Sequence, residues 1–216
     1  MIARKALFAV TAAAAALSGC GKTGDIVVEQ GVGITALRSA CPSVGVPYFT
    51  GDVTLFNPAD ARTQDALDVT ATMTNVRSQC NDTGEQVYTT ATFDVLAQRR
   101  DVRGARSITL PYFSTVVRGG TAVISKRIGQ VTVNFADGQE RAQASGSAAA
   151  YVNRAAATLP DDIRERITRR RRSGEDDAAV DPLTEPEVRA AVARSTFELL
   201  VGFQLSDDEL AYNATR

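Results

Sequence analysis

Residues 32–152 alternate between apolar and polar side chains with a period of two, and this alternation constrains the fold more than any other feature. Leu67, Val69, Ala71 and Met73, for example, alternate with polar residues. Successive side chains of a β-strand point to opposite faces, so this pattern predicts a half-buried strand. The same rule predicts strands at residues 87–97, 131–135 and 141–151, with shorter candidates at 33–37, 53–56, 107–110 and 121–125.

Turn-forming residues separate these segments. They occur at Asn57-Pro58, Asn81-Asp82-Thr83-Gly84, Gly119-Gly120 and Asp137-Gly138. Asp137-Gly138 is the strongest hairpin signal, because both central residues of a type I′ turn take a positive φ. About seven to nine short strands with frequent turns predict an immunoglobulin- or fibronectin-like β-sandwich over residues 32–152. The chain has no tryptophan to pack on a disulfide as in antibody domains, so only the sandwich architecture is predicted.

One predicted strand carries only small residues on one face. Its small side chains are Ala142, Ala144, Gly146, Ala148 and Ala150. Small residues let another part of the molecule approach the backbone closely. We therefore expect something bulky to lie against this face.

After Val152 the pattern changes to a helical period, which predicts a C-terminal extension of two or three helices over residues 153–216. Thr158 and Asp161 predict the cap of a helix that runs to about Arg172. Thr184-Glu185-Pro186-Glu187 predicts the cap of a long helix, and Ser206 with Glu209 predicts that of a short terminal one. The apolar residues assigned to the long helix are Val188, Val192, Phe197, Leu199, Leu200 and Phe203.

This apolar surface has two interpretations. The first is that the long helix packs on the sandwich, over the small-residue face of residues 142–150. The second is that the surface is a partner site, covered only on assembly, because exposed apolar patches often mark such sites.

The N-terminal residues form a signal-like leader. Arg4 and Lys5 precede an apolar run at residues 6–17, which is too short to span a hydrocarbon core of about 30 Å. The run ends in Leu17-Ser18-Gly19-Cys20, which resembles the lipobox of bacterial lipoproteins. The alternative is an ordinary secretory signal that happens to be followed by a cysteine.

The lipoprotein resemblance implies a processing route and a location. It implies a signal peptide at residues 1–19, a lipid on Cys20 and a lipidated tether at residues 20–31. The lipid anchor would make the membrane a partner. Gly21 follows the cysteine, and by the sorting rule of enteric lipoproteins this implies the outer membrane of a Gram-negative-type bacterium, facing the periplasm.

With Cys20 lipidated, Cys41 and Cys80 remain. Export to an oxidising compartment predicts that they form a disulfide; two buried free thiols are the alternative. The closed loop of about 40 residues would stabilise the fold by about 3–4 kcal/mol.

Composition excludes several kinds of chemistry. The chain has no histidine, so Ser-His-Asp and Cys-His nucleophile systems are excluded. Two cysteines without histidine do not supply the ligands of a structural zinc site, and we expect no metal and no cofactor. The formal net charge of −1 creates no field that would attract nucleic acid, so no nucleic-acid partner is expected.

The remaining candidate sites have structural explanations. Arg169, Arg170, Arg171 and Arg172 could contact anionic lipid or an acidic partner, but arginines also stabilise a helix C-terminus. Paired acids could serve acid–base or calcium chemistry, yet each pair falls in the first turn of a predicted helix; they are Asp161, Asp162, Asp207, Asp208 and Glu209. Pro111-Tyr112-Phe113 could be a docking tip, although packing in the core or at an edge is favoured.

Three functions are compatible with these features. The favoured hypothesis is a non-enzymatic envelope lipoprotein that binds an unidentified envelope protein or has a structural role. A carboxylate-dependent hydrolase of envelope glycans would need two converging acids. A carrier of a small apolar ligand would need a cavity.

Overall fold

The computed structural model describes residues 39–169, 174 and 180–215. The chain divides into two compact units, Met1–Thr35 with Arg169–Val180, and Ala36–Thr168 with Asp181–Arg216. Nearly all described residues belong to the second unit, and the description below concerns that unit. Cys20, the tether, the candidate strand at residues 33–37 and Arg170 to Arg172 lie outside the described residues.

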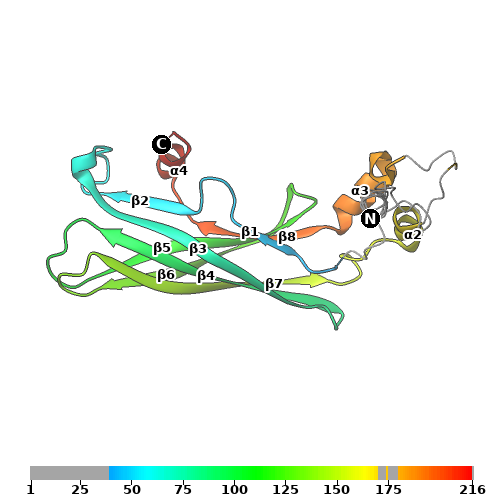
Figure 1. Cartoon of the computed structure of the whole chain (residues 1–216), viewed down its shortest axis with the longest axis horizontal. Coiled ribbons are helices and arrows are strands. Elements are labelled where there is room, and N and C mark those ends of the chain that lie inside the picture. The colour runs from blue at the N-terminus through cyan, green and yellow to red at the C-terminus, as the bar shows by residue number, and fades with distance from the viewer. Residues whose placement is uncertain (1–38, 170–173, 175–179, 216) are drawn as a thin grey trace, which may run out of the picture. The chain divides into compact units, whose positions relative to one another are not determined.

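Two four-stranded sheets form the body of this unit (Figure 1). The first, called here the β5 sheet, has the order β1 (Ser43–Gly45), β8 (Phe197–Phe203), β5 (Arg106–Arg118) and β6 (Ala122–Phe135). The second, the β4 sheet, has the order β2 (Asp52–Phe56), β3 (Leu67–Asn81), β4 (Gln86–Arg99) and β7 (Arg141–Asn153). The protein is therefore mostly β, with short helices mainly in its C-terminal part.

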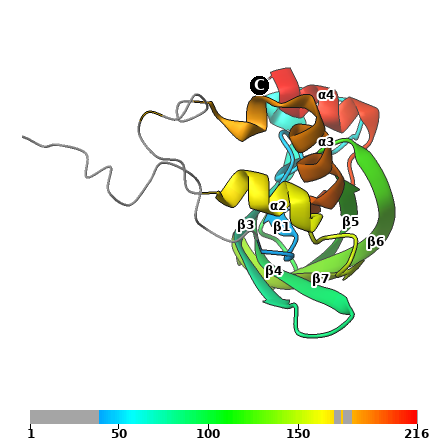
Figure 2. The same cartoon turned by 90° about the vertical axis from the view of Figure 1, so that its right-hand side faces the viewer.

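Neighbouring strands are antiparallel except for β1 and β8, which run parallel. β3–β4 and β5–β6 are long hairpins, whereas the connections from β4 to β5 and from β6 to β7 cross between the sheets. Seen end on, the strands curl around a common interior (Figure 2). Buried side chains from both sheets form one continuous hydrophobic core.

The period-two pattern correctly predicted β2, β3, β4, β6 and β7. On β3, Val69, Ala71 and Met73 are buried, and on β4 Phe93 and Val95 are buried, while the intervening residues are less so. The polar residues between them face outward because one face of the β4 sheet meets the core and the other meets water. The short candidates at 107–110 and 121–125 are parts of the longer strands β5 and β6.

An aromatic ring lies against the small-residue face of β7 at Gly146, as the expectation of a bulky neighbour required. Phe93 on β4 lies opposite Gly146 on β7, and a Cβ atom on Gly146 would be 2.4 Å from Cζ of Phe93. The ring of Tyr112 on β5 meets Phe93 edge-on, with ring centroids 5.0 Å apart. The interpretation that the long C-terminal helix lies over this face is wrong, because Phe93 lies over Gly146 and residues 197–203 of that segment form β8 in the β5 sheet.

The predicted long helix after Thr184 is also wrong in its extent. A one-turn 3-10 helix η3 (Pro182–Thr184) precedes α3 (Pro186–Ser195), and residues 197–203 form strand β8. The spacing of Val188, Val192, Leu199 and Phe203 fits one helix face. The residues Phe197, Leu199, Val201 and Phe203 also fit a period of two, and they bury 92% or more of their surface in the β5 sheet.

Helices α2 (Asp161–Thr168) and α3 pack on each other and form a second, smaller core. Ile163 and Ile167 of α2 pack in this core with Val188 and Ala191 of α3. Arg166 pairs with Glu185 and Glu187 at the start of α3. These two helices lie together at one end of the strands (Figures 1 and 2).

Helix α4 (Asp207–Thr215) packs elsewhere, against β2. Tyr212 meets Phe56 edge-on, and the amide of Asn213 donates hydrogen bonds to the carbonyls of Phe49 and Asp52, each 2.8 Å long. A 3-10 turn, η2 (Gln64–Ala66), precedes β3. No helix in the described part of the chain is long and apolar enough to cross a membrane.

Only one of the three predicted helix caps forms. The Ser206 hydroxyl accepts a hydrogen bond from the backbone N–H of Glu209, whose carboxylate accepts from the N–H of Ser206. Thr184 instead donates to the carbonyl of Asp181, and Thr158 donates to that of Arg154. Both hydroxyls therefore stabilise the turn that precedes them and do not cap a helix.

The predicted turns are present, but their geometry differs from the prediction at one of them. Gly119 and Gly120 join β5 to β6 with φ values of 63° and 77°, the combination that a type I′ hairpin turn needs. At Asp137-Gly138 only the glycine has a positive φ, of 74°. The backbone angles therefore exclude a type I′ turn here. This turn joins β6 to β7, which belong to different sheets, so it does not close a hairpin.

Candidate functional site

The first half of β6 is exposed on both of its faces. From Ala122 to Ile128 every residue is exposed, whereas Val131, Val133 and Phe135 further along the strand are buried. Val123, Ile124 and Ile128 expose 64%, 56% and 55% of their surface. Large apolar side chains exposed together on one element commonly mark an interaction site.

β7 lies beside this part of β6 without pairing with it. Among the described strands β6 pairs only with β5, and β7 pairs only with β4, so both present an unpaired edge. We call the space between residues 122–128 of β6 and residues 148–152 of β7 the β6–β7 seam. It opens into a recess of about 210 Å³ whose lining includes Val116, Ile124, Arg127, Ala150, Tyr151 and Leu199.

The recess has a buried apolar bottom and an exposed rim. Val116, Ala150 and Leu199 expose 6% or less of their surface and form its bottom. Ile124 and Tyr151, which exposes 60%, form its rim. An apolar side chain that entered the recess from outside would therefore be largely removed from water.

Two cations accompany the exposed apolar residues of β6. Lys126 lies 5.4 Å from the ring centroid of Phe113 in a cation–π contact. Arg127 lies on the same face of β6 as Gly129 and Val131, because every second residue of a strand points to the same side. This is the core-facing side of the strand, yet Arg127 is exposed and lines the recess. Among the described residues Arg127 makes no ion pair or side-chain hydrogen bond.

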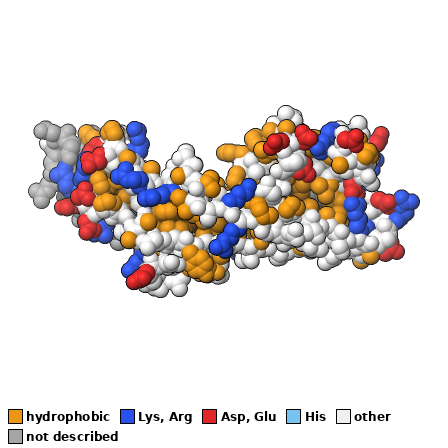
Figure 3. Space-filling view, turned by 180° about the vertical axis from the view of Figure 1, so that it is seen from behind, with side chains coloured by type: hydrophobic (Ala, Val, Ile, Leu, Met, Phe, Trp, Pro, Cys, Tyr) orange, Lys and Arg blue, Asp and Glu red, His pale blue; other side chains and the backbone are white. Residues whose placement is uncertain are grey.

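Figure 3 shows hydrophobic and basic side chains interspersed over the middle of the face opposite to that of Figure 1. This is the side of the unit on which β5 and β6 lie (Figure 2). We define the β5–β6 surface as Phe113, Val123, Ile124, Lys126 and Ile128.

A second pocket, of about 310 Å³, lies at the end of the strands beside the helices. Its lining includes Cys41, Ala157, Leu159 and Ile167 with Phe197 of β8. The neighbouring disulfide joins Cys41 to Cys80 at the end of β3, with the two Cα atoms 6.1 Å apart. The predicted disulfide is thus present, and it holds the segment before β1 against the β4 sheet.

The opposite end of the strands is held by arginines. Arg99, only 1% exposed, donates hydrogen bonds to the carbonyls of Val102, Gly104, Ala136 and Gln139. These contacts fix the loops that connect the two sheets. Four of its five N–H donors are used in these bonds and its side chain is buried, so Arg99 is a structural element.

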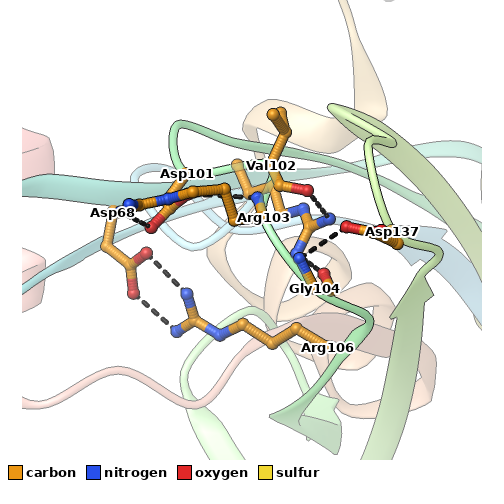
Figure 4. Close-up of polar contacts among 8 residues, drawn as sticks. Asp68, Asp101, Val102, Arg103, Gly104, Arg106 and Asp137 are labelled. Carbon is orange, nitrogen blue, oxygen red and sulfur yellow. Dashed lines mark hydrogen bonds and ion pairs between the residues drawn. The ribbon is translucent and has the colours of Figure 1, made fainter.

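Arg106 connects the two sheets directly. It donates two hydrogen bonds of 2.6 Å from β5 to the carboxylate of Asp68 on β3 (Figure 4). These bonds to Asp68 raise the pKa of Arg106 above its ordinary value. Asp101 lies in the same cluster, where the side-chain hydrogen bonds of Arg103 hold the pKa of that carboxyl well below its usual range.

The structure does not bring the predicted acidic residues together. Asp161 and Asp162 begin α2, which packs with α3, whereas Asp207, Asp208 and Glu209 begin α4, which packs on β2. Arg169 is exposed directly after α2. No group of three or more Asp, Glu, Cys or His side chains suited to a metal ion occurs in the residues that the structure describes.

Sequence reasoning assigned Pro111-Tyr112-Phe113 mainly to packing, and Tyr112 does pack on Phe93. It missed the exposed half of β6. A usable signal was present, because Val123 and Ile124 are adjacent apolar residues and Lys126 and Arg127 adjacent cations, a pattern that breaks the alternation of a half-buried strand. Comparison of the chain with protein families, curated proteins and solved structures found no match.

Proposed function

We propose that this protein is a membrane-anchored lipoprotein of the cell envelope that acts as a non-enzymatic binding or structural module. The lipobox at Cys20 supports the anchor, and the Cys41–Cys80 disulfide fits an oxidising compartment such as the periplasm. Eighteen residues separate Cys20 from Ser39. Fully extended, they span at most about 60 Å, so the domain would work close to the membrane.

The finer fold is also part of this proposal. Two sheets with a shared core and long antiparallel hairpins support an immunoglobulin- or fibronectin-like sandwich. Domains of this architecture commonly serve as binding modules, but function depends on the site and not on the fold.

The β5–β6 surface carries the proposal. Three apolar side chains more than half exposed form a surface that a partner could cover, on a strand that has a neighbour along only one edge among the strands that the structure describes. Lys126 and Arg127 favour an acidic partner. The surface is formed by the folded hairpin itself, so binding does not require the domain to unfold.

Site-specific photocrosslinking in the native envelope tests this surface. A photoreactive residue at Ile128 or Val123 is expected to give one defined adduct, identified by mass spectrometry. Leu96, which is 47% exposed on the β4 sheet, is the matched control position and is expected to give none. Equal adducts from all three positions, or none from the β5–β6 surface, would contradict the proposal.

The anchor is tested separately by the mass of the mature protein. The expected chain begins at Cys20 and carries diacylglycerol and an N-acyl group, and Cys20→Ser is expected to leave the membrane fraction. A wild-type chain without lipid mass would refute the anchor, while the proposed binding surface would be unaffected.

The pocket beside the helices favours a second candidate function, the carriage of a small apolar ligand. Its volume of about 310 Å³ is at the small end of the range for ligand sites. Thr158 lines it, so Thr158→Phe is expected to fill part of the pocket and reduce binding of the fluorescent probe N-phenyl-1-naphthylamine. Undiminished probe binding would exclude this pocket as the carrier site.

A further inference from the structure

The two unpaired strand edges at the β6–β7 seam offer backbone hydrogen-bonding groups as well as side chains. Along a free edge, alternate residues direct their N–H and C=O groups outward, and these groups can pair with an added strand. Here both edges face one space, with β6 belonging to the β5 sheet and β7 to the β4 sheet. An extended segment placed in this space would therefore have a strand edge on each side.

At one end of the seam, the side chain of Tyr112 fills the space between β6 and β7. Tyr112 on β5 lies against Gly129 of β6, where a Cβ atom would be 2.4 Å from Cζ of the ring. Its hydroxyl donates a 2.7 Å hydrogen bond to the carbonyl of Ser147 on β7. The tyrosine thus bridges β5 and β7 across the seam, and it satisfies a carbonyl of β7 from outside that strand's own sheet.

Further along β5 from Tyr112, at Ser114 and Val116, the lining of the recess begins. Its bottom is apolar, at Val116, Ala150 and Leu199, while Ser125 and Arg127 line it from β6. The recess of about 210 Å³ can hold an aliphatic side chain or two. The side chains of an added strand alternate between its two faces, so every second one would point into the recess.

Charge selects the kind of segment that fits. From Ala122 to Phe135 the charged residues of β6 are Lys126 and Arg127, and β7 carries only Arg141. Neither strand has an acidic residue. A second copy of this chain paired through β6 would bring the same two cations against each other, and lysine on an exposed edge is a common protection against such self-pairing.

Resting on the proposed binding function, we infer that the seam takes one extended segment of an acidic partner protein as an added β-strand. Apolar side chains of the segment enter the recess, and its carboxylates face Lys126 and Arg127. Backbone pairing along the β6 edge supplies affinity that does not depend on sequence, while the recess and the two cations select an alternating apolar and acidic pattern.

The test uses a defined peptide and the full-length protein in detergent micelles. The probe is a capped fluorescent peptide of about eight residues, a usual strand length, that alternates valine with glutamate. We expect it to bind with slowed amide hydrogen exchange at residues 122–128. The same peptide with alternate backbone amides N-methylated is expected not to bind, because it loses the donors along one edge.

Charge-reversal variants distinguish binding at the seam from non-specific attraction of the acidic peptide to basic residues. Arg127→Glu is expected to weaken binding of the glutamate peptide by about tenfold and to improve binding of a peptide with lysine in place of glutamate. Arg141→Glu, at the other end of β7, is the matched control and is expected to change neither.

Several results would overturn the inference. They are the absence of binding by the alternating peptides, equal binding of the N-methylated peptide, and protection that appears outside the seam. A concentration-dependent dimer with protected β6 amides would show a second copy as the occupant and would also overturn it. Crosslinks from Ile128 without peptide binding would refute strand addition and leave the proposed function intact. Peptide binding without such crosslinks would refute the proposed function.

Discussion

The hydroxyl of Tyr112 on β5 donates a 2.7 Å hydrogen bond to the backbone carbonyl of Ser147 on β7, a strand of the other sheet. The ring of the same tyrosine meets Phe93 of β4 at an interplanar angle of 77°. One side chain therefore joins the two sheets at the point where β6 and β7 diverge. On one side of it the core is closed, and on the other the β6–β7 seam is open.

Tyr112→Phe removes this hydroxyl and leaves the ring in place. We expect the free energy of unfolding to fall by about 1 kcal/mol, the usual net value of one hydrogen bond. Urea denaturation measures the change. Tyr48→Phe is the control, because Tyr48 is 90% exposed and its substitution is expected to have no measurable effect.

Gly146→Ala tests the close approach of Phe93 to β7. The new Cβ would lie 2.4 Å from Cζ of Phe93, so the ring must move within a packed core. We expect a loss of about 1–3 kcal/mol in unfolding free energy. Gly45→Ala is the control, since its Cβ would be at an ordinary 3.8 Å from Leu200; an equal loss in both variants would contradict the explanation.

Arg99→Lys tests the arginine that holds the loops between the sheets. Lysine cannot reproduce a planar group with donors to four carbonyls, so buried acceptors are left without partners. We expect thermal unfolding to report a loss of about 3 kcal/mol or more. Arg103→Lys, at a side chain 88% exposed, is expected to change stability by less than about 0.5 kcal/mol.

The hydrogen bond from Asn75 lowers the pKa of Asp94, and a second bond from Ser145 lowers it further. Because the pKa is lower in the folded state, Asp94 contributes stability above the unfolded pKa of about 3.9 and loses that contribution as pH falls below it. NMR titration is expected to show the low pKa in the wild type. Asn75→Ala is expected to raise it toward the ordinary value; an unchanged titration in that variant would contradict the assignment.

Much of the β architecture could be predicted from sequence because one face of the β4 sheet is exposed to solvent and the other packs on the core, which makes apolar and polar residues alternate. Val69, Ala71 and Met73 alternate with threonines for that reason, and Val87 to Ala97 follow the same rule. β8 could not be predicted in this way. It is the strand between β1 and β5, and its apolar residues fit a helix face as well as they fit a strand.

The candidate surface was beyond sequence reasoning for a different reason. Whether Ile124 and Ile128 are buried depends on whether another strand lies beside β6, which is a property of the whole sheet order and not of the local pattern. Small residues on β7 did indicate a bulky neighbour. They could not indicate that it would be Phe93 from the adjacent strand and not a helix from the end of the chain.

The most direct test of the central claim compares Ile128→Asp with Leu96→Asp in stability and in recovery of the crosslinked partner. Both side chains are exposed, at 55% and 47%, so each variant is expected to melt within about 1 °C of the wild type. We expect Ile128→Asp to lose the partner and Leu96→Asp to retain it. Retention of the partner by Ile128→Asp, or its loss from both variants, would contradict a binding module that works through the β5–β6 surface.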